Sequence, residues 1–385
     1  MSNYPTYKLG DVAEIILGQS PESKSYNTKG EGLPFFQGKT EFTDWFPIPN
    51  KWCTEPKKIA EPFDVLLSVR APVGPTNIAK EKCCIGRGLA AIRYADCYKY
   101  VLYYLRSVSK YLESKATGTT FSSISGDTIK NLPIPLPPLP TQYAIVIRIE
   151  TLFAELDKAV QHLRTAQQQI KTYRQAVLRD AFEGCKELKT VFELSTVVTS
   201  GSRGWAKYYT DKEDARFVRI TDLTRDNIIL QNKNIQYISL PPNAEGKRSL
   251  LQPNDVLVSI TADLGSIALV PHNIGEAYIN QHIAMIRFKN NKLGKFMAYY
   301  LKSDFGQREL LKNKRGNGKL GLGLDDIRNT YIPFVDEEEA SEIVKKIELR
   351  LLQAEAVEAS IEKALQQSEA LRQSILKKAF EGELV

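Results

Sequence analysis

Histidine and cysteine, the side chains that most often carry metal or nucleophile chemistry, are scarce in this chain. The three histidines among its 385 residues, His162, His272 and His282, have no nucleophile or ligand partner at a telling spacing. The five cysteines are odd in number and form no CxxC or Cys/His pattern. The sequence therefore suggests neither a disulfide framework nor a zinc site, and we expect reduced, buried thiols.

Long apolar runs are missing as well. No segment approaches the length that spans a bilayer, and the first residues, MSNYPTYKLG, place no basic region before an apolar stretch. We therefore expect a cytoplasmic protein without a membrane partner. With 43% hydrophobic and 25% charged residues, the composition is that of a globular protein, and the length allows two or three domains.

What the chain does contain is an internal repeat. An offset of 198 residues aligns 129–184 with 327–382 without a gap, and both copies end in AFEG. Further upstream, slightly smaller offsets pair DVLLSVRAPVG (64–74) with DVLVSITADLG (255–265), IGRGLAAIR (85–93) with INQHIAMIR (279–287), and YYLRS (103–107) with YYLKS (299–303). The chain is therefore two copies of one unit, each a mixed region followed by a helix.

The helical part of each copy has no internal proline or glycine. Apolar or small residues recur every three or four positions, which predicts helices over 141–184 and 337–382, the first of them about 65 Å long. Each helix ends at a glycine suited to a left-handed cap, Gly184 or Gly382. The apolar stripes contain Ile145, Ile149, Leu152, Leu156, Val160, Leu163, Ala166, Ile170, Tyr173, Val177 and Ala181, and Ile343, Ile347, Leu351, Ala354, Val357, Ile361, Leu365, Leu371 and Ile375.

These stripes are too long to stay solvated. We expect the two helices to pair as an antiparallel coiled coil, because a globular region starts each helix and parallel packing would crowd both regions at one end. Association of the helices with another subunit is the alternative, and both arrangements could hold. An antiparallel pair would place the two globular regions at opposite ends of a stiff rod.

Each globular region reads as a curved, mostly β domain with a few helices. Short β-branched or alternating runs between Gly, Pro, Asn and Asp turns predict strands within 11–17, 64–69, 83–94, 216–223, 255–260 and 282–288. Residues 99–114 and 295–313 carry helical periodicity. The expected fold class is α+β, with two mixed domains joined by two long antiparallel helices.

Charge and loop chemistry point to an anionic partner. The formal net charge is +7, whereas the helices carry +1 and −3, so the basic excess lies in the globular regions. Within a shared apolar frame, Arg70 becomes Thr261, Pro72 becomes Asp263, and GRG (86–88) becomes NQH (280–282). Arg, Asn and Gln read base edges in the major groove. The pattern favours two related readers of two different short sequences.

Signatures of catalysis are missing: there is no P-loop and no NPPY-like adenine methyltransferase motif. GNGKLG (316–321) fits GxGxxG, but it follows the basic run KNKR rather than a strand, and the repeat aligns it with GTTFSS. A dinucleotide site is therefore not expected. A basic loop of this kind suits backbone phosphates.

Several of these segments together resemble the specificity subunit of type I restriction-modification systems. They are NLPIPLPPLPTQYAI (131–145), NTYIPFVDEEEASEI (329–343), the doubled AFEG helix ending and the loop GTTFSSIS (118–125). The second copy departs from the pattern by replacing LPPLPTQ with FVDEEEA, which lacks the prolines and the glutamine.

The resemblance implies a non-catalytic subunit that binds a bipartite, asymmetric double-stranded DNA target, one half-site per target-recognition domain. It implies two modification subunits that use S-adenosylmethionine to methylate adenine, and restriction subunits that translocate and cut DNA with ATP and Mg. No cofactor is expected in this chain. The domains would be 1–140 and 185–336, each followed by a spacer helix, 141–184 and 337–385. The helix lengths would then set the spacer between the half-sites.

Polar residues in or beside the predicted loops are the candidate DNA contacts, although a solvated surface explains any single one about as well. In the first domain they are Gln19, Ser20, Lys24, Tyr26, Gln37, Lys39, Arg70, Arg87, Thr119 and Thr120. In the second domain they are Ser202, Arg203, Lys207, Arg219, Thr261, Gln281, His282, Arg315, Asn317 and Lys319.

Two other classes of function stay open from the sequence alone. A coiled-coil adaptor whose globular ends bind proteins would show no DNA complex and little salt sensitivity. A lone methyltransferase or nuclease would bind a cofactor or modify DNA by itself.

Overall fold

The computed structural model describes residues 4–117, 122–241, 247–312, 314 and 321–385. The chain divides into two compact units, the first formed by Met1–Arg164 and Glu362–Val385, the second by Thr165–Ile361. Each unit therefore takes in one globular region and part of both long helices, α5 (Leu139–Phe182) and α10 (Glu337–Glu381). The division into four segments follows chain order rather than contacts, and it stays a prediction. Among the described residues, no helix combines the length and apolar character that crossing a membrane requires.

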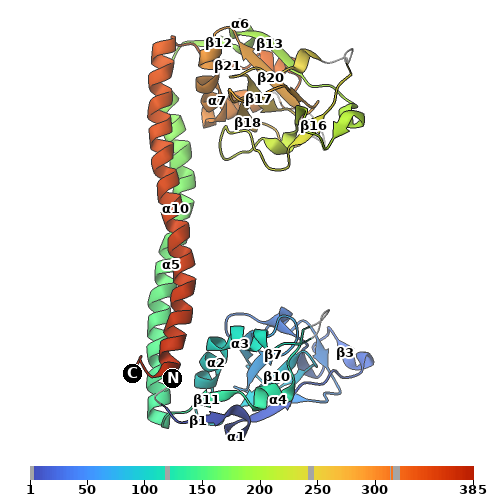
Figure 1. Cartoon of the computed structure of the whole chain (residues 1–385), viewed down its shortest axis with the longest axis vertical. Helices are drawn as coiled ribbons and strands as arrows, with labels where there is room; N and C mark the ends of the chain where they lie inside the picture. Colours follow the sequence, from blue (N-terminus) through green and yellow to red (C-terminus); the bar gives the residue numbers. More distant parts are fainter. Residues whose placement is uncertain (1–3, 118–121, 242–246, 313, 315–320) are drawn as a thin grey trace. The chain divides into compact units, whose positions relative to one another are not determined.

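The globular region of the first unit combines small sheets with short helices (Figure 1). Its strands are β1 (Thr6–Lys8), β2 (Glu14–Leu17), β3 (Tyr26–Asn27), β4 (Leu33–Phe36), β5 (Trp52–Cys53), β6 (Ile59–Ala60), β7 (Val65–Ser68), β8 (Thr76–Ile78), β9 (Cys83–Ile85), β10 (Leu89–Arg93) and β11 (Pro133–Pro135). Its helices are α1 (Leu9–Val12), α2 (Tyr98–Ser107), α3 (Ser109–Ser114) and α4 (Gly126–Lys130).

The globular region of the second unit repeats this plan. Its strands are β12 (Leu188–Thr190), β13 (Ser195–Ser200), β14 (Tyr209–Thr210), β15 (Ala215–Val218), β16 (Gln236–Ile238), β17 (Val256–Ser259), β18 (Ile267–Leu269), β19 (Ala277–Ile279), β20 (Ile283–Phe288) and β21 (Tyr331–Pro333). Its helices are α6 (Val191–Leu194), α7 (Gly294–Lys302), α8 (Asp304–Leu311) and α9 (Leu324–Arg328).

Sheet order shows the repeat in three dimensions. The antiparallel sheet β2-β10-β7-β8 corresponds to β13-β20-β17-β18, and the pair β1-β11 corresponds to β12-β21. A second sheet, β3-β5-β4-β9-β6, contains the parallel pair β4 and β9, as β14-β16-β15-β19 contains the parallel pair β15 and β19. Where β6 pairs with β9, the second unit has an isolated antiparallel bridge between Leu250 and Tyr278. The expected fold class of mixed, mostly β repeated domains with two long helices is confirmed.

In the first unit, the end of α10 lies against the globular region. Ile375, Leu376, Ala379 and Phe380 share a core with the start of α5 and with α2. The ring of Phe380 meets Tyr100 at 5.1 Å and Tyr104 at 5.2 Å between centroids, edge to face. Such aromatic contacts add to the free energy of burial.

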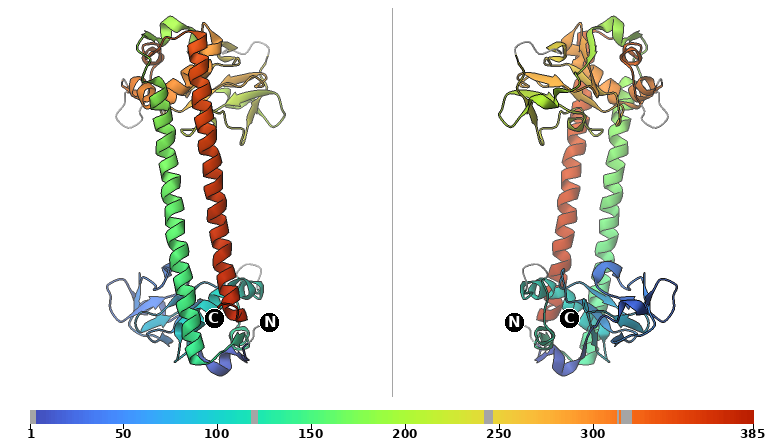
Figure 2. Two further views of the ribbon diagram at one scale, coloured as in Figure 1. Left: turned by 90° about the vertical axis from the view of Figure 1, so that its left-hand side faces the viewer. Right: turned by 90° about the vertical axis from the view of Figure 1, so that its right-hand side faces the viewer.

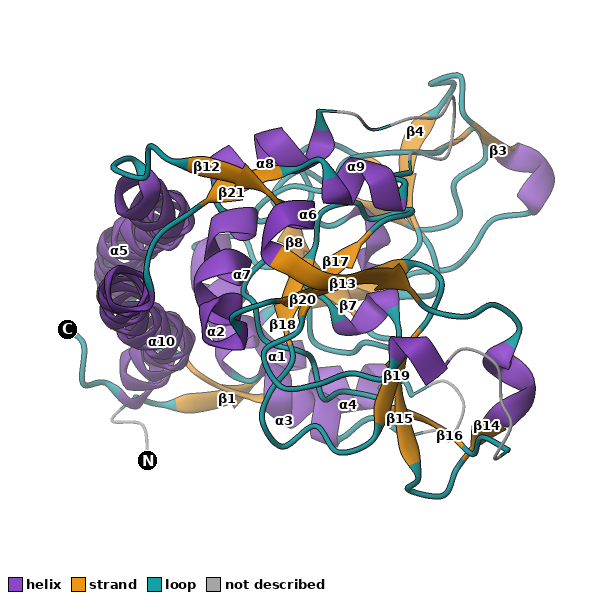
Figure 3. Ribbon diagram, turned by 90° about the horizontal axis from the view of Figure 1, so that it is seen from above, coloured by secondary structure: helices purple, strands orange, loops and turns teal. Residues whose placement is uncertain are grey.

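In the second unit, the end of α5 does the same. The Phe182 ring contacts Phe296 and Tyr300 of α7 at 5.3 and 5.4 Å, and α7 lies between the long helices and the strands (Figure 3). The two AFEG sequences therefore mark equivalent corners, since each closes a helix on an aromatic helix of the globular region beside it.

The helices run antiparallel within each unit (Figure 2). In the second unit, Arg174 pairs with Glu358 at 2.7 Å, and further along α5 Asp180 reaches back to Arg350 at 4.0 Å. In the first unit, Asp157 of α5 pairs with Arg372 of α10. The order of partners reverses from one helix to the other, as antiparallel packing requires.

The helical segments differ from the sequence prediction in detail. Tyr173, Val357 and Leu371 were placed on the apolar stripes, but their side chains are exposed. Gly382 adopts the expected left-handed conformation with φ 84°. At the other helix end, Gly184 has no positive φ, because α5 stops at Phe182 and the Cys185 N–H donates to the Phe182 carbonyl at 3.2 Å.

The helical periodicity of 99–114 and 295–313 is confirmed, and each segment forms two helices. The break in the second unit lies at Ser303, whose hydroxyl accepts from the Gly306 N–H at 3.2 Å and so caps α8. A serine that caps a new helix ends the previous one, and periodicity alone does not show this.

Candidate nucleic-acid interface

In the first unit, three loops meet beside the end of β7, and we call them the first loop cluster: residues 18–20, 70–72 and 86–88. The Val69 N–H donates to the Gly88 carbonyl at 2.9 Å, and the Gln19 N–H donates to the Ile85 carbonyl at 3.1 Å. The Arg87 N–H donates to the Ser20 hydroxyl at 3.3 Å. The backbone therefore fixes these loops against one another.

A fourth segment joins this cluster at Gln37. A Cβ atom added to Gly88 would lie 2.2 Å from the Gln37 carbonyl oxygen, so only glycine permits this approach. The side chains of Gln19, Gln37, Arg70 and Arg87 are exposed here. Four of the sequence-predicted residues thus share one solvent-facing surface.

Tyr26 lies at the edge of the same cluster. Its ring stacks on Phe35 with centroids 4.7 Å apart, and its hydroxyl donates to the Pro21 carbonyl at 2.8 Å. Burial and the nearby thiol of Cys53 raise the pKa of Tyr26, whereas Arg87 acts to lower it. Tyr26 is therefore a neutral hydrogen-bonding group beside a cationic one.

Two predicted lysines are not joined to the cluster by these contacts. Lys24 pairs with Glu22 at 2.8 Å, and both side chains are exposed. Lys39 lies in the short turn Lys39–Glu41 and is exposed to solvent. Both are exposed cations, the chemistry that backbone phosphates attract.

The second loop cluster comprises residues 201–203, 261–263 and 280–282. The Ile260 N–H donates to the His282 carbonyl at 2.9 Å, as Val69 does to Gly88. Ser202 forms a parallel bridge with Asn280. A Cβ atom on Gly201 would lie 1.8 Å from the Ile279 carbonyl oxygen, so this loop too depends on a glycine.

The predicted polar residues of this cluster are in mutual contact. The Thr261 hydroxyl lies 2.6 Å from His282 Nδ1, and Gln281 Nε2 lies 2.9 Å from His282 Nε2. Arg203 is exposed beside Ser202. Positions that the repeat aligns in the sequence therefore lie at the same place in the two loop clusters. The first unit has arginines there, and the second has neutral polar groups.

Two further predicted residues, Arg219 and Lys207, lie near this cluster and are held by contacts outside it. Arg219 follows β15, and its guanidinium donates to the Asn234 carbonyl at 2.8 Å. Lys207 lies in the turn Trp205–Tyr208, with its ammonium 4.9 Å from the centre of the Tyr208 ring.

The remaining predicted contacts, Thr119, Thr120, Arg315, Asn317 and Lys319, lie outside the described residues. The residues that follow them are attached to the clusters. The Ala71 N–H donates to the Ser122 carbonyl at 2.9 Å, and the Leu322 N–H donates to the Ile260 carbonyl at 2.9 Å.

A buried serine holds the central loop of each cluster. Ser68 donates to the carbonyls of Arg70 and Pro72 at 3.1 and 2.9 Å. Ser259 donates to the Asp263 carbonyl and accepts from the Ser266 N–H at 2.8 Å. These bonds curl the chain just after β7 and β17 and so direct the next side chains outward.

The sequence analysis did not name Asp263, within the second loop cluster, or Arg225, which joins it from outside, among the candidate DNA contacts. The Arg225 Nε donates to Asp263 Oδ1 at 2.7 Å, and Ser266 donates to Asp263 Oδ2 at 2.7 Å. Burial acts to raise the pKa of Asp263, but the bonds from Ser266 and Arg225 outweigh it, and the pKa lies below its usual value. The change from Pro72 to Asp263 was the available signal.

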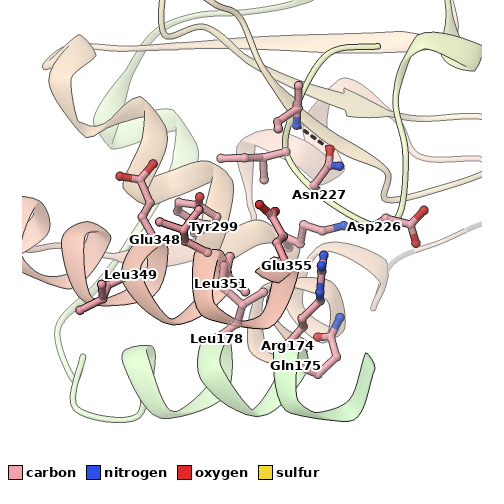
Figure 4. A pocket seen from close by; sticks show the side chains of 14 residues that line it. Arg174, Gln175, Leu178, Asp226, Asn227, Tyr299, Glu348, Leu349, Leu351 and Glu355 are labelled. Atoms are coloured by element: carbon pink, nitrogen blue, oxygen red, sulfur yellow. Dashed lines mark hydrogen bonds between the residues drawn. The ribbon is translucent and has the colours of Figure 1, made fainter. Parts of the chain in front are cut away.

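Two pockets lie elsewhere, one in each unit, where the globular region meets the long helices. In the second unit, a pocket of about 350 Å³ is lined by acidic Asp226, Glu348 and Glu355 and by exposed Leu349 and Leu352 (Figure 4). Arg174 and Lys302 also line this pocket, but its three carboxylates outnumber them, so the pocket offers phosphates no cationic excess. Within the described ranges, no group of three or more His, Cys, Asp or Glu side chains is placed to hold a metal ion.

Comparisons with curated proteins give relatives of one kind. Over 181 residues the chain is 39% identical to the MjaX specificity subunit of Methanocaldococcus jannaschii. The aligned segment makes up 46% of this chain and 41% of that protein. It is 24% identical to the type I restriction enzyme EcoBI specificity subunit of Escherichia coli over 98% of this chain and 85% of the relative.

Solved structures share the fold. The HsdS subunit from Thermoanaerobacter tengcongensis matches with a TM-score of 0.62 and 18% identity, covering 99% of this chain and 97% of that one. A chain from work on assembly and conformational transition of the type I R-M system matches with a TM-score of 0.75 and 19% identity, covering 99% and 98%.

The family described as type I restriction modification DNA specificity domain matches residues 1–163 and 186–366, one match on each repeat. The two matches together cover most of the chain, and each contains one of the loop clusters. The chain belongs to the family of type I restriction modification DNA specificity domains.

Proposed function

We propose that this chain is the subunit that gives a type I restriction-modification complex its DNA specificity, and that it reads a bipartite, asymmetric target with one half-site per globular region. One observation carries the proposal: two loop clusters on the same backbone frame present different polar side chains. A shared frame with different contact groups is what two readers of unlike sequences need.

The chemistry of each cluster favours a different base. Exposed Arg70 and Arg87 in the first cluster suit guanine, whose O6 and N7 accept two hydrogen bonds. Gln281 in the second suits adenine, which offers one donor and one acceptor. Exposed lysines such as Lys24 and Lys39 suit the phosphates that hold the protein in register.

The long helices suit the role of a spacer between the half-sites. Helices α5 and α10 contain 44 and 45 residues, and apart from Pro140 in the first turn of α5 neither contains proline or glycine. Phe380 anchors the end of α10 to the globular region of the first unit, and Phe182 anchors the end of α5 to that of the second. A helix pair of this kind resists bending, so we propose that its length sets the length of the unread DNA.

Catalysis is assigned to partners. We propose that two modification subunits bind this chain and supply S-adenosylmethionine for adenine methylation, and that restriction subunits supply ATP- and Mg-dependent translocation and cleavage. Exposed apolar side chains on the long helices, Tyr143 and Ile147 of α5 and Leu349 and Leu352 of α10, support a scaffold role, because such residues mark protein interfaces.

The test of DNA reading is a binding selection with the purified full chain and a library of randomised duplexes. We expect two enriched half-sites at one fixed separation, and an affinity that falls steeply with salt as phosphate contacts require. An absence of any enriched sequence, with binding unaffected by salt, would contradict the proposal and favour a protein-binding adaptor.

The test of the spacer is a seven-residue helical insertion after Arg164 of α5 and a matching one after Ile361 of α10, where the two units divide. Seven residues add about 10.5 Å and keep the helix faces nearly aligned. The preferred spacer should lengthen by about 3 base pairs at 3.4 Å each, with both half-sites unchanged. The matched control inserts the same residues in the exposed loop at Gly30. An unchanged spacer in the helix variant would refute the role.

A further inference from the structure

Three polar side chains form a row in the second loop cluster, from Thr261 through His282 to Gln281. The Thr261 hydroxyl lies 2.6 Å from His282 Nδ1, and the Gln281 Nε2 lies 2.9 Å from His282 Nε2. His282 is itself fixed, because its N–H donates to Asn280 Oδ1 at 3.1 Å and its carbonyl accepts from the Ile260 N–H at 2.9 Å.

The donors in this row set its hydrogen-bond direction. A carboxamide nitrogen only donates, so His282 Nε2 is the acceptor in its contact with Gln281. The ring proton is then on Nδ1, which donates to the Thr261 hydroxyl. Both ring nitrogens are used within the protein, and His282 has no nitrogen left for a base.

Gln281 keeps the groups that a base can use. The bond to His282 takes one of its two N–H donors and leaves the second N–H and the Oε1 acceptor. One donor and one acceptor side by side match the N7 and N6 of adenine, and they do not match the two acceptors of guanine. The half-buried amide is held before DNA arrives, so little side-chain freedom is lost on binding.

The first repeat offers a direct comparison at this position. Arg87 occupies the turn before β10 as Gln281 occupies the turn before β20, and its exposed guanidinium has the geometry that reads guanine. Arg87 is not backed by a histidine, since Gly88 stands where the second repeat has His282.

We propose that Gln281 reads one adenine in the half-site of the second globular region, and that His282 and Thr261 are positioning residues for its carboxamide. The assignment deepens the proposed function and rests on it. It states which side chain meets which base, and it separates the reader from the two side chains that orient it.

The experiment is the randomised-duplex selection, run with the full chain and with Gln281→Arg and Gln281→Glu. At one position of the second half-site, wild type should prefer adenine by about 10- to 100-fold over other bases, which is the range of a bidentate contact. Gln281→Arg should change that position to guanine and Gln281→Glu to cytosine, with the first half-site unchanged. The matched control, Arg87→Gln, should change one position of the first half-site only.

The outcomes separate this inference from the function on which it rests. Enrichment of a bipartite sequence that is identical for wild type and Gln281→Arg would overturn the inference and leave the function standing. No enrichment for wild type itself would overturn both.

The positioning role has its own pair of variants. His282→Gln keeps an acceptor near the place of Nε2 and should retain most of the preference for adenine. His282→Ala removes this acceptor. The preference for adenine at the single position read by Gln281 should then fall about 10-fold, since one of the two hydrogen bonds to the base is no longer held in place. An equal loss in both variants, spread over all positions of the half-site, would show a merely structural role and overturn the assignment.

Discussion

Each unit buries one carboxylate against an arginine on the neighbouring strand, but the surroundings of the two pairs differ. In the first unit, Asp64 holds Arg93 at 2.9 and 3.0 Å, and Glu14 shares the guanidinium at 2.9 Å. In the second unit, Asp255 holds Arg287 at 2.7 and 2.8 Å, and the guanidinium also donates to the Leu250 carbonyl at 2.9 Å rather than to a second carboxylate among the described residues. The Arg93 side chain is 36% exposed and that of Arg287 only 21%. The repeat thus keeps the buried contact and changes its access to water.

The two units also differ at a matched position where each globular region meets the long helices. Trp45 of the first unit has the guanidinium of Arg106 5.5 Å from its ring and the ammonium of Lys99 5.6 Å from it. At the position of Arg106, the second unit has Lys302, 9% exposed, which donates to the Arg225 carbonyl. Burial lowers the pKa of Arg106 without discharging it, whereas burial lowers the pKa of Lys302 to about 8.

The largest expected effect tests whether the aromatic anchors are equivalent. Phe182→Ala and Phe380→Ala should each destabilise their unit by about 3–5 kcal/mol, because each ring is buried against two others. Denaturant unfolding with probes in each unit measures this. Leu371→Ala, at an exposed position of α10, is the control and should cost little. A large loss for only one of the two phenylalanines would break the comparison.

The buried ion pairs should differ in a stated direction. Asp255→Ala should cost about 3 kcal/mol, because it leaves Arg287 half-buried without a carboxylate. Asp64→Ala should cost less, because Arg93 keeps Glu14 and is more exposed. Urea unfolding of both variants measures the difference. The double variant Asp64→Ala with Glu14→Ala should approach the loss of Asp255→Ala, and the comparison fails if it does not.

Alkaline pH should distinguish the two units. Because the pKa of Lys302 is lower in the folded state than the ordinary 10.5, the second unit should gain stability as pH rises through 8. The gain is about 1 kcal/mol between pH 7 and pH 9 and is complete only above 10.5. Hydrogen exchange in α7 relative to α2, corrected for intrinsic rates, measures it.

A matched variant isolates the lysine. Lys302→Arg places a permanent cation there, as Arg106 does in the first unit, and should abolish the pH-dependent gain. An equal gain in wild type and Lys302→Arg would assign the effect to other groups.

The smallest effect concerns the cation contacts of the first unit. Trp45→Phe keeps an aromatic ring but weakens its attraction for Arg106 and Lys99, and should cost about 0.5 kcal/mol. Thermal unfolding at low and high salt measures this. Ile229→Val, at an exposed position of the second unit, is the matched control, and an equal effect would show that the cation contacts are not responsible.

Much of the fold follows from the sequence because the repeat provides two versions of each element. The pairs DVLLSV and DVLVSI, or YYLRS and YYLKS, show which side chains the frame requires, and the structure places them on β7 and β17 and on α2 and α7. Periodicity fixed the helices but not which partner covers each face. Tyr173, Val357 and Leu371 therefore turned out to be exposed.

The candidate interface was predictable in part for the same reason. The alignment set Arg70 opposite Thr261 and Arg87 opposite Gln281, and backbone bonds bring each pair to equivalent places. Their contact with bases stays a prediction. Arg225 could not be found this way, because its approach to Asp263 joins residues 38 positions apart in a loop. Lys24 was found among the polar loop residues, and its partner Glu22 lies only two positions earlier in the chain.

The anchor Phe380 has a consequence for synthesis. Its ring completes the hydrophobic core of a unit whose other residues begin at the amino terminus, whereas the second unit uses only the contiguous stretch 165–361. A growing chain on the ribosome can thus finish the second unit first. The amino-terminal unit, although its first part is translated earlier, must wait for Glu362–Val385 to emerge before its core is closed.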